Sequence, residues 1–480
     1  MRWDRGPVLL NVLISLGAEI LAFTIKITEI SLSDHELLYC PRMLHLYSFL
    51  LLFLSLSAFG QNHLDVQKRV TDAFNRRSSD DLLIGSSVGY IDEKGKLEMN
   101  FGVVNSSHEK FEVGSVSKTF TGIVIAQLVL EQKIKLSTLL EEVLPELKGT
   151  YAGTVSLKLL GNHKARFVRN HPEGDRISEE DIIIFLKTFT PGPKDPAEGE
   201  KFYSNLGFTT LGIVISRLTG KSYSDAIRER ILSPLEMTET NFLISINDHN
   251  SLITPHNILL QPTSADILSD LAGASGGITS SLHDMMKFIE FNYNPDAAVK
   301  LAQKECLGFD NNPGEGYIWK NGGMTGYSSI MIIDTVNHRG SIVLSNSNNG
   351  PSSERLGLIA LGEEDKYIQD LKIESDLSSA VLGQYFNEDF KLYMEVVVTR
   401  QGFLGFLLKD MPDDDNARAT RLITEDRRKF LLMGRGWSSK DFVQFRINSE
   451  TGVKEVLLSE FEKNDKNGNP VFEESIFVMK

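Results

Sequence analysis

The sequence predicts a mixed α/β (α+β) protein, in which a sheet domain with a helical insertion is followed by a small antiparallel β domain. Strand-like segments occupy residues 82–104 and return after residue 311, on either side of a mostly helical middle region. From about residue 382 onward, apolar and polar residues alternate with period two between bends rich in Gly, Asn and Asp. Such alternation is typical of antiparallel strands.

The composition limits the class of protein and its partners. The chain has 480 residues, of which 41% are hydrophobic and 24% are charged, as expected for a globular protein of more than one domain. Its formal net charge is -14, and its pI is near 5.3. Because binding to a phosphate backbone requires basic patches, we expect no nucleic-acid partner.

Residues 1–60 differ from the rest, and we assign them to an over-extended N-terminus plus a signal peptide or membrane anchor. Apolar runs span Val8–Ile25 and Ser48–Gly60. The second run has the length of a secretory h-region and ends in small residues before Gln61. Met43 stands just before it, so we expect translation to start there and the protein to be exported to the periplasm or the extracellular space. The alternative is membrane association through one or both runs.

The cysteine content fits an exported bacterial protein. The chain contains Cys40 and Cys306. Cleavage after the second apolar run would leave Cys306 alone, so that no intramolecular disulfide could form. A single cysteine fits a periplasm or cell surface better than a disulfide-rich secreted scaffold.

The sheet domain is assigned to residues 61–362. Residues 82–104 predict two strands joined by a turn that contains Asp92 and Gly95. A long helix is expected to end near residue 132, and helical spacing recurs in residues 178–189, 206–220 and 222–235. Ser178 with Asp181 one turn later predicts a capped helix start. The domain is expected to close with strands at 327–334 and 341–347 and a helix at about 352–360.

A charged stretch, residues 363–379, is the predicted linker to a C-terminal antiparallel β domain at residues 380–480. Its predicted strands are residues 392–399, 403–408, 442–447, 453–461 and 471–479. The acidic run Asp413–Asp415 predicts a solvated loop. The segment Asp465–Asn469 predicts a hairpin turn and not a calcium loop, because Pro470 stands where such a loop needs glycine.

A Ser-x-x-Lys pattern, Ser115-Val116-Ser117-Lys118, stands at the start of an apolar helix. Residues three apart share a helix face, so Lys118 should lie beside Ser115 in a place with little water. A buried lysine must find partners or lose its proton, and a deprotonated lysine can accept the proton of a serine. Ser107–Lys110 fits the same pattern but lies in a polar turn. The alternative for Ser115 and Lys118 is a helix cap beside a lysine that reaches solvent.

Two further segments carry side chains suited to the same chemistry. Tyr203-Ser204-Asn205 stands before a predicted helix. A tyrosine beside cations can carry a proton, and an asparagine can bond both a lysine and an amide substrate. Lys320-Asn321-Gly322-Gly323 leads into a strand, where the lysine supplies positive charge and the glycines admit a substrate. Taken alone, each segment also has a structural explanation, as a helix entry and as a turn.

In this order, the three segments resemble the serine β-lactamase and penicillin-binding protein superfamily, and the Tyr-x-Asn form resembles its class C β-lactamase-related branch. The similarity covers about residues 65–347 and extends to the flanks, such as ILSPLEMTET and AGASGGITSSLHDMMKF. It implies an antiparallel sheet flanked by helices, with a helical subdomain. The C-terminal domain, which opens with LGQYF, resembles the lipocalin-like β-barrels appended to this family. That domain would stabilise the chain, or else shape the cleft or hold a ligand.

The resemblance implies a catalytic role for five residues. Ser115 would be the acylated nucleophile, with Lys118 as its base or proton partner. Tyr203 would carry the proton to the leaving group and activate the hydrolytic water. Asn205 would orient Lys118 and the substrate amide. Lys320 would lower the pKa of Tyr203 and attract an anionic substrate group.

The resemblance also implies a substrate-binding set with two departures from the family pattern. The backbone N–H groups of Ser115 and Gly323 would form an oxyanion hole, next to Gly322 and Asn321. Where class C β-lactamases read Lys-Thr-Gly-Ser, two hydroxyls for a substrate carboxylate are missing here, although Asn321 could donate a bond. Where many relatives have a Leu-x-x-His-Thr-Ser-Gly stretch, this chain reads LLGNHKARFV, in which His163 matches in position but the Ser-Gly loop is absent. The first departure argues against efficient β-lactam hydrolysis. The second predicts a reshaped cleft wall, so that the substrate of the relatives cannot be transferred to this chain.

The sequence therefore predicts a serine hydrolase that acts through an acyl-enzyme on a small molecule or peptide. The expected substrate is a small amide or ester, such as a D-amino-acid peptide, a β-lactam or an ester. The alternative is a non-hydrolytic penicillin-binding or scaffold protein that kept the fold. No metal or cofactor is implied.

Overall fold

The computed structural model describes residues 63–480 with several gaps. The positions left out within that range are 175, 193–196, 198, 243–250, 267, 312–315, 366–380, 399–403, 410–417, 425–428, 434–441, 448, 450, 452, 465–469 and 480. The predicted signal or anchor segment, most of the predicted linker, the acidic loop and the turn at 465–469 therefore lie outside the described residues. Within the described part of the chain, no helix has the length and apolar composition that a membrane span requires.

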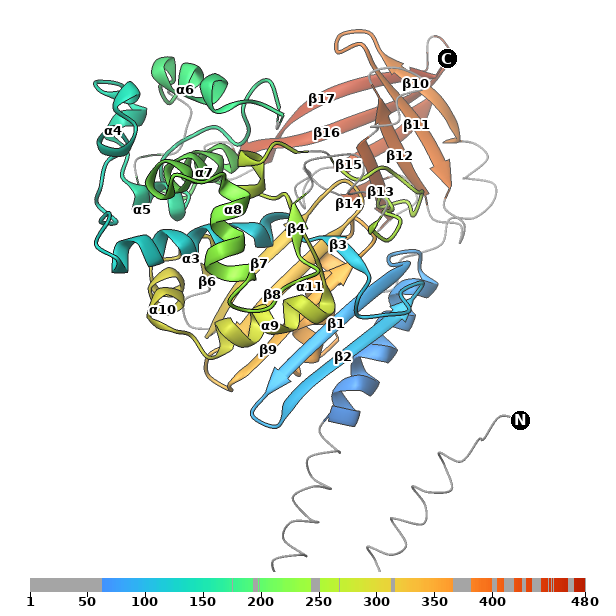
Figure 1. Cartoon of the computed structure of the whole chain (residues 1–480). Coiled ribbons are helices and arrows are strands. Elements are labelled where there is room, and N and C mark those ends of the chain that lie inside the picture. The colour runs from blue at the N-terminus through green and yellow to red at the C-terminus, as the bar shows by residue number, and fades with distance from the viewer. Residues whose placement is uncertain are drawn as a thin grey trace, which may run out of the picture. The chain divides into compact units, whose positions relative to one another are not determined.

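A six-stranded antiparallel sheet in the order β2-β1-β9-β8-β7-β6 forms the centre of the first domain (Figure 1). Its strands are β1 (Gly85–Asp92), β2 (Gly95–Gly102), β6 (Asp310–Asn311), β7 (Tyr317–Gly323), β8 (Ser328–Asp334) and β9 (Arg339–Ser345). The first strand pairs with the last, so that Val88 lies opposite Val343. The predicted fold class, with strands from both ends of the domain in one sheet around a helical middle, is confirmed.

The β1–β2 hairpin closes where the sequence predicted its turn. Asp92 is paired with Gly95, and the φ of Gly95 is +137°, a backbone conformation that favours glycine. The Oδ1 atom of Asp92 accepts a hydrogen bond of 2.8 Å from the backbone N–H of Lys94. The aspartate and the glycine together fix the register in which β1 enters the sheet.

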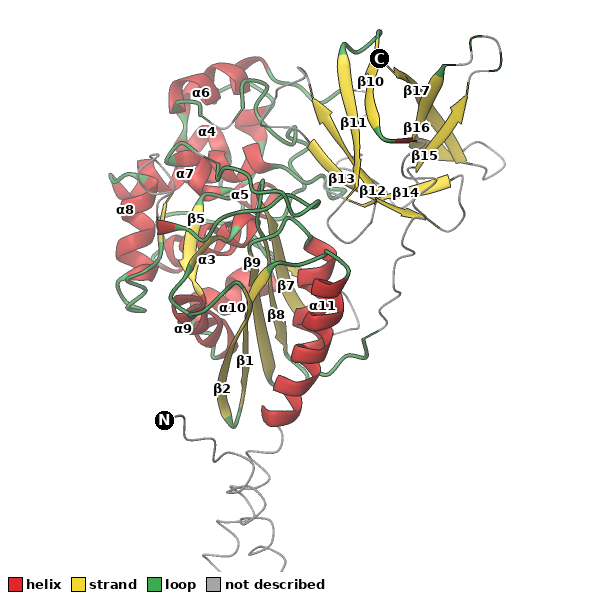
Figure 2. Cartoon of the chain, turned by 90° about the vertical axis from the view of Figure 1, so that its right-hand side faces the viewer, coloured by secondary structure: helices red, strands yellow, loops and turns green. Residues whose placement is uncertain are grey.

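Helices cover both faces of the sheet (Figure 2). On one face lie α11 (Gly350–Ala360) and a helix over residues 63–79, and their side chains share one buried cluster with β8 and β9. On the other face lies α9 (Leu282–Tyr293), whose Met285 and Phe288 are fully buried. The N-terminal end of α11 is one wall of the site described below.

The helical middle of the domain contains the short helices α4 (Leu140–Val143), α5 (Leu157–Gly161), α6 (Glu179–Thr188), α7 (Asn205–Thr219), α8 (Tyr223–Ile227) and α10 (Ala297–Lys304). The predicted cap of α6 is confirmed, because Ser178 Oγ accepts from the N–H of Asp181 while the Asp181 carboxylate accepts from the N–H of Ser178. The helix predicted at 222–235 is shorter than expected. It ends at Ile227 and continues as a π-helical turn, Arg228–Leu232.

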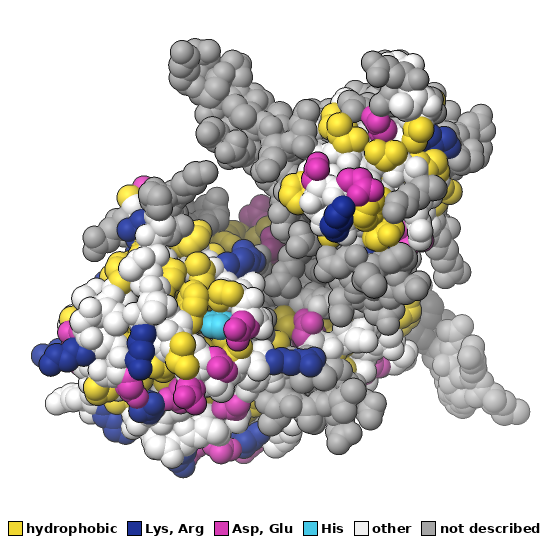
Figure 3. Space-filling view, turned by 90° about the horizontal axis from the view of Figure 1, so that it is seen from above, with side chains coloured by type: hydrophobic (Ala, Val, Ile, Leu, Met, Phe, Trp, Pro, Cys, Tyr) yellow, Lys and Arg dark blue, Asp and Glu magenta, His cyan; other side chains and the backbone are white. Residues whose placement is uncertain are grey.

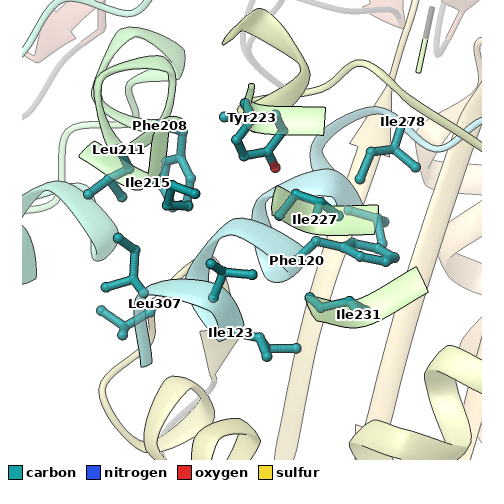
Figure 4. Close-up of a cluster of buried hydrophobic side chains, with 14 of the residues drawn as sticks. Phe120, Ile123, Phe208, Leu211, Ile215, Tyr223, Ile227, Ile231, Ile278 and Leu307 are labelled. Carbon is teal, nitrogen blue, oxygen red and sulfur yellow. The ribbon is translucent and has the colours of Figure 1, made fainter. Parts of the chain in front are cut away.

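Helix α3 (Ser117–Leu130) runs through the centre of the apolar core and is buried almost all round, as its sequence predicted. Side chains from α7, α8 and the neighbouring loops converge on it (Figure 4). The residues labelled there are Phe120, Ile123, Phe208, Leu211, Ile215, Tyr223, Ile227, Ile231, Ile278 and Leu307. This packing holds in a fixed place the N-terminal end of α3, which carries Lys118, and the turn with Ser115 that precedes it.

A small sheet in the order β3-β5-β4 leads into that helix. Its strands are β3 (Lys110–Glu112), β4 (Asn241–Phe242) and β5 (Ile278–Ser281). Glu112 is only 1% exposed. One carboxyl oxygen accepts a hydrogen bond of 3.2 Å from the N–H of Asp266, and the other has no hydrogen-bond partner among the described residues. Burial and the Asp266 carboxylate raise the pKa of Glu112 to about 9.

Glu112 should therefore make the stability of the protein depend on pH. Because its folded-state pKa of about 9 lies above the ordinary 4.5 of the unfolded chain, the folded state retains a proton that the unfolded state releases. The free energy of unfolding should fall as pH rises from about 5 towards 9, and the Glu112→Gln variant should lose this slope and gain on the order of 1–3 kcal/mol at pH 8. Urea titrations at several pH values measure this, with the exposed Glu173→Gln as a control that keeps the slope. An equal slope in Glu112→Gln and wild type would contradict the assignment.

The C-terminal strands form a closed antiparallel barrel in which β10 pairs with β17. The strands are β10 (Gly383–Asn387), β11 (Leu392–Val398), β12 (Leu404–Lys409), β13 (Arg418–Thr424), β14 (Lys429–Met433), β15 (Phe442–Ile447), β16 (Lys454–Asn464) and β17 (Pro470–Met479). Its interior contains buried Tyr385, Met394, Phe406, Val456 and Phe477. The five predicted strands are present, whereas β10, β13 and β14 were not predicted as strands. Strand β10 is short, β13 starts among charged residues and β14 lacks alternation. The likeness to lipocalins stays a prediction.

Acidic and basic side chains are interspersed on the surface of the described residues (Figure 3). Several form ion pairs, such as Lys158 with Glu305 at 2.6 Å and Arg230 with Glu131 at 2.6 Å. Exposed ion pairs of this kind contribute little to the free energy of unfolding, typically about 0–1 kcal/mol each. The stability of the domain therefore rests on its apolar clusters.

Candidate active site

Ser115 lies in a single 3₁₀ turn, Gly114–Val116, between β3 and α3. Gly114 has a φ of +52°, and a Cβ at that position would come within 2.8 Å of the backbone nitrogen of Gly323. A side chain on Gly114 would thus be both strained and in collision with β7. The turn presents Ser115 to a cavity of about 440 Å³, which the side chain lines together with Tyr203 and Gly323.

Lys118 lies directly behind Ser115 and is fully buried. Its Nζ atom donates to Ser115 Oγ at 3.1 Å, to Asn205 Oδ1 at 2.8 Å and to the backbone oxygen of Ser275 at 2.5 Å. The last two atoms can only accept, so they take up two N–H bonds of the lysine. The third bond direction of the Lys118 nitrogen points to Ser115. It holds a proton when the lysine is charged and a lone pair when the amine is neutral. A proton can therefore pass between Ser115 and Lys118 without movement of heavy atoms.

Tyr203 approaches Ser115 from the helical middle of the domain. Its position is fixed because Ser204 caps α7, with Oγ accepting from the N–H of Gly207 at 2.9 Å. The Tyr203 hydroxyl lies 2.6 Å from Ser115 Oγ. The cationic groups of Lys118 and Lys320 lie 4.9 and 5.1 Å from the centre of its ring.

These cations change the acidity of the Tyr203 phenol. Burial opposes its ionisation, but the charges of Lys118 and Lys320 and the hydrogen bonds of its hydroxyl outweigh burial and lower the pKa to about 8. Hydrogen bonding to the charged form and nearby opposite charge both favour a phenolate. Tyr203 is therefore placed and tuned to take up and return a proton near neutral pH.

Lys320 lies in β7 and is 1% exposed. Its ammonium group donates to Asp310 Oδ2 at 2.9 Å, and the other oxygen of the same carboxylate pairs with Lys201. Burial opposes ionisation of Asp310, yet the two lysines lower its pKa below the usual range. Lys320 was expected to attract an anionic substrate group, but in the structure its charge faces Asp310 and the ring of Tyr203.

His163 supports Tyr203 from the side. The two rings stack with their centres 4.4 Å apart, and His163 Nδ1 accepts from the backbone N–H of Ser204 at 3.2 Å. Burial and the nearby charges of Lys320 and Lys118 lower the pKa of His163 well below its usual value. The imidazole is therefore neutral and acts as an aromatic support.

Strand β7 brings the expected oxyanion-hole groups to the 3₁₀ turn. A Cβ at Gly322 would lie 2.1 Å from the backbone oxygen of Val113 and 3.0 Å from the backbone nitrogen of Ser115. Only glycine allows this contact between the strand and the turn. The next residue, Gly323, has open space where its side chain would be and lines the cavity with Ser115.

Asn321 has a partner that the sequence did not predict. Its Nδ2 atom was expected to serve a substrate carboxylate, but it donates to Glu354 Oε1 of α11 at 2.6 Å. Glu354 lines the cavity too, and so does Arg169, whose guanidinium lies 5.1 Å from the centre of the Tyr203 ring. Asn205 Nδ2 is also engaged, by Asn170 Oδ1 at 2.7 Å.

The structure thus brings together Ser115, Lys118, Tyr203, Asn205 and Lys320, and places Asn321, Gly322 and Gly323 at the edge of the same cavity. Sequence reasoning missed Asp310, Arg169 and Glu354. Asp310 reaches Lys320 only because it pairs with Trp319 across β6 and β7. Glu354 lies in a predicted helix, but a single acidic residue on a helix carries no signal of its own.

No metal site is evident in the part of the chain that the structure describes. There, no group of three or more His, Cys, Asp and Glu side chains is arranged to hold a metal ion. Cys306 is a free thiol, and its partial burial raises its pKa.

Comparison with known sequences places these residues in a family. A family model described as Beta-lactamase matches residues 86–364. A beta-lactamase of Providencia stuartii is 25% identical over 258 residues, which cover 52% of this chain and 65% of that protein. Protein flp of Staphylococcus aureus (strain N315) is 24% identical over 299 residues, which cover 55% of this chain and 60% of that protein. The chain thus spans less than two thirds of the length of these relatives.

Solved structures with similar folds include the Beta-Lactamase/D-Alanine Carboxypeptidase from Pseudomonas syringae, with a TM-score of 0.56 and 19% identity over 62% of this chain and 99% of that chain. A class C beta-lactamase gives a TM-score of 0.55 and 19% identity over 63% of this chain and 97% of that chain. At such identity the likeness concerns the fold. Because the family model matches more than half of its length, the chain belongs to the beta-lactamase family.

Proposed function

We propose that this protein is a serine hydrolase that acts through an acyl-enzyme on a small amide or ester, such as a D-amino-acid peptide, a β-lactam or an ester. The observation that carries the proposal is the hydrogen-bonded line from the Tyr203 hydroxyl through Ser115 Oγ to Lys118 Nζ, with spacings of 2.6 and 3.1 Å. A nucleophile within hydrogen-bond reach of its base, with the base held by a third group, is the arrangement that covalent catalysis requires. Here Asn205 holds Lys118.

In the acylation step, Ser115 Oγ forms a bond with the substrate carbonyl carbon while its proton passes to the Tyr203 phenolate, directly or by way of Lys118. The carbonyl oxygen becomes an oxyanion next to the backbone N–H groups of Ser115 and Gly323, which stabilise the charge. As the oxyanion collapses, the bond to the leaving amine or alcohol breaks. The leaving group takes up the proton from Tyr203, and the acyl group stays on Ser115.

In the deacylation step, a water molecule replaces the leaving group. The Tyr203 phenolate accepts a proton from this water, whose oxygen attacks the ester carbon of the acyl-enzyme. Collapse of the second oxyanion breaks the bond to Ser115 Oγ, which recovers its proton. The product is a free carboxylic acid. The same groups thus serve both half-reactions.

Time-resolved intact-mass spectrometry tests the proposal, with a penicillin and with a p-nitrophenyl ester as probes. We expect an adduct that forms and decays, equal to the whole penicillin or to the acyl part of the ester. The Ser115→Ala variant should form none. Ser107→Ala is the matched control, because Ser107 belongs to the second Ser-x-x-Lys pattern of the chain, and it should behave as wild type.

Three outcomes would change the conclusion. An adduct that persists in Ser115→Ala would place the nucleophile elsewhere. An adduct that forms on Ser115 but never decays would favour the alternative of a non-hydrolytic penicillin-binding protein. No adduct and no turnover with either probe would favour a scaffold that kept the fold.

A further inference from the structure

The cavity at Ser115 contains a carboxyl group, that of Glu354, which the proposed reaction does not use; burial raises its pKa above the usual value. Glu354 Oε1 accepts 2.6 Å from Asn321 Nδ2, and Glu354 lines the cavity. No ion pair of Glu354 with a lysine or arginine is present among the described residues. The other charged side chain that lines the cavity is Arg169, which lies over the ring of Tyr203.

The geometry of β7 places this carboxylate at a definite distance from the reacting centre. Side chains two apart on a strand point to the same face, so Asn321 and Gly323 share one face, and Lys320 and Gly322 share the other. The Lys320 face points to Asp310 and to the turn of Ser115. The Asn321 face opens into the cavity. Because a strand rises about 3.3 Å per residue, the Asn321–Glu354 pair lies roughly 7 Å along the strand from Gly323.

A substrate group that reaches the Asn321–Glu354 pair meets a partly buried acceptor. A carboxylate there would face a like charge, and one of the two N–H donors of the Asn321 amide is already given to Glu354. A protonated amine would meet a carboxylate of opposite charge, whose one hydrogen bond, from the uncharged Asn321 amide, does not neutralise it. Charge-assisted hydrogen bonds are about twice as strong as neutral ones, so the two kinds of substrate should differ widely in binding.

We propose that Glu354 is a specificity-determining residue, which selects substrates whose protonated amine reaches the Asn321–Glu354 pair, roughly 7 Å along β7 from Gly323, and rejects those with a carboxylate there. The inference rests on the proposed function and narrows its substrate class to aminoacyl esters and amides or amine-bearing peptides. It also accounts for the missing hydroxyls of the Lys-Asn-Gly-Gly segment, because a site built for an ammonium group needs no donors for a carboxylate.

The test uses three p-nitrophenyl esters of a six-carbon acid, whose chain ends in an ammonium, a methyl or a carboxylate group. The kcat/KM of each charged ester is divided by that of the methyl ester. In wild type we expect this relative kcat/KM to be at least tenfold higher for the ammonium ester than for the carboxylate ester. In Glu354→Gln the ratio of ammonium to carboxylate should approach one. Glu363→Gln, which alters the acceptor of the Tyr317 hydroxyl beyond the end of α11, should keep the wild-type ratio.

A binding measurement separates this inference from the proposed function. In the Ser115→Ala background, hexylammonium should raise Tm more than hexanoate does, and the added change Glu354→Gln should remove the difference. The role of Glu354 would be overturned if wild type hydrolysed the ammonium and carboxylate esters with similar kcat/KM. It would also be overturned if Glu354→Gln left the ratio of these two values unchanged. If no ester is turned over by way of Ser115, the proposed hydrolase fails, and equal shifts of Tm by the two ligands would then also reject Glu354 as the selective group.

Discussion

Replacing Tyr203 with phenylalanine is expected to lower kcat/KM for an activated ester by about 10²–10⁴, the usual contribution of a positioned acid–base group. Phenylalanine keeps the ring that stacks on His163 and removes only the hydroxyl 2.6 Å from Ser115. The same change should remove a titration from the pH profile. With the pKa of Tyr203 near 8, wild-type kcat/KM should rise with pH up to about 8 and then level off.

The sign follows from the role of the phenolate. Below its pKa the phenol holds its proton and cannot take one from Ser115, so activity should fall tenfold for each pH unit below about 8. Steady-state kinetics from pH 6 to 9.5 measure this, and the Tyr203→Phe profile should be flat in that window. Tyr293→Phe, which loses a hydrogen bond to the backbone oxygen of His338, is the control and should match wild type. If kcat/KM of Tyr203→Phe still rose with pH up to about 8, as in wild type, the titration would belong to another group.

The Gly322→Ala variant is expected to lose about 10²–10³ in kcat, as enzymes do when one oxyanion-hole donor is displaced. The new methyl group would lie 2.1 Å from the backbone oxygen of Val113 and 2.6 Å from Ser329 Oγ. Backbone atoms cannot yield by such a distance, so β7 and the turn of Ser115 must move apart. Overpacking of this kind also costs about 1–3 kcal/mol of stability. Activity and thermal unfolding of the purified variant measure both effects.

Gly207→Ala is the matched control for this variant. A Cβ at Gly207 would meet its nearest atoms at 3.5 Å, which is ordinary contact, and the residue lies in α7. Alanine there should keep kcat and hold or raise Tm, because glycine in a helix is roughly 0.5–1 kcal/mol less favourable than alanine. A Gly322→Ala protein with wild-type kcat would show that the contact of β7 with the turn does not matter for catalysis.

Local patterns made most of the fold predictable. The hairpin at Asp92 and Gly95, the capped start of α6 and the buried helix after Ser115 depend on residues close together in sequence, and all three are confirmed. Two failures have the same local origin. The helix predicted at 222–235 ends at Ile227 and continues as a π-helical turn, and β14 went unseen because KFLLM lacks the alternation that marks a strand.

The sequence by itself determined the family resemblance, the succession of sheet strands, helical middle and β domain, and the residues that we assign to the reaction, because short motifs and periodic patterns carry these. Only the tertiary structure decided how their charges are balanced. The pairing of Lys320 with Asp310, the cations around Tyr203 and the hydrogen bond of Asn321 with Glu354 join residues from separate elements. No local pattern encodes such contacts, since they arise where strand pairing and helix packing bring distant side chains within a few ångströms. The same contacts set the proton affinity of Tyr203 and, in our proposal, the charge that a substrate must carry.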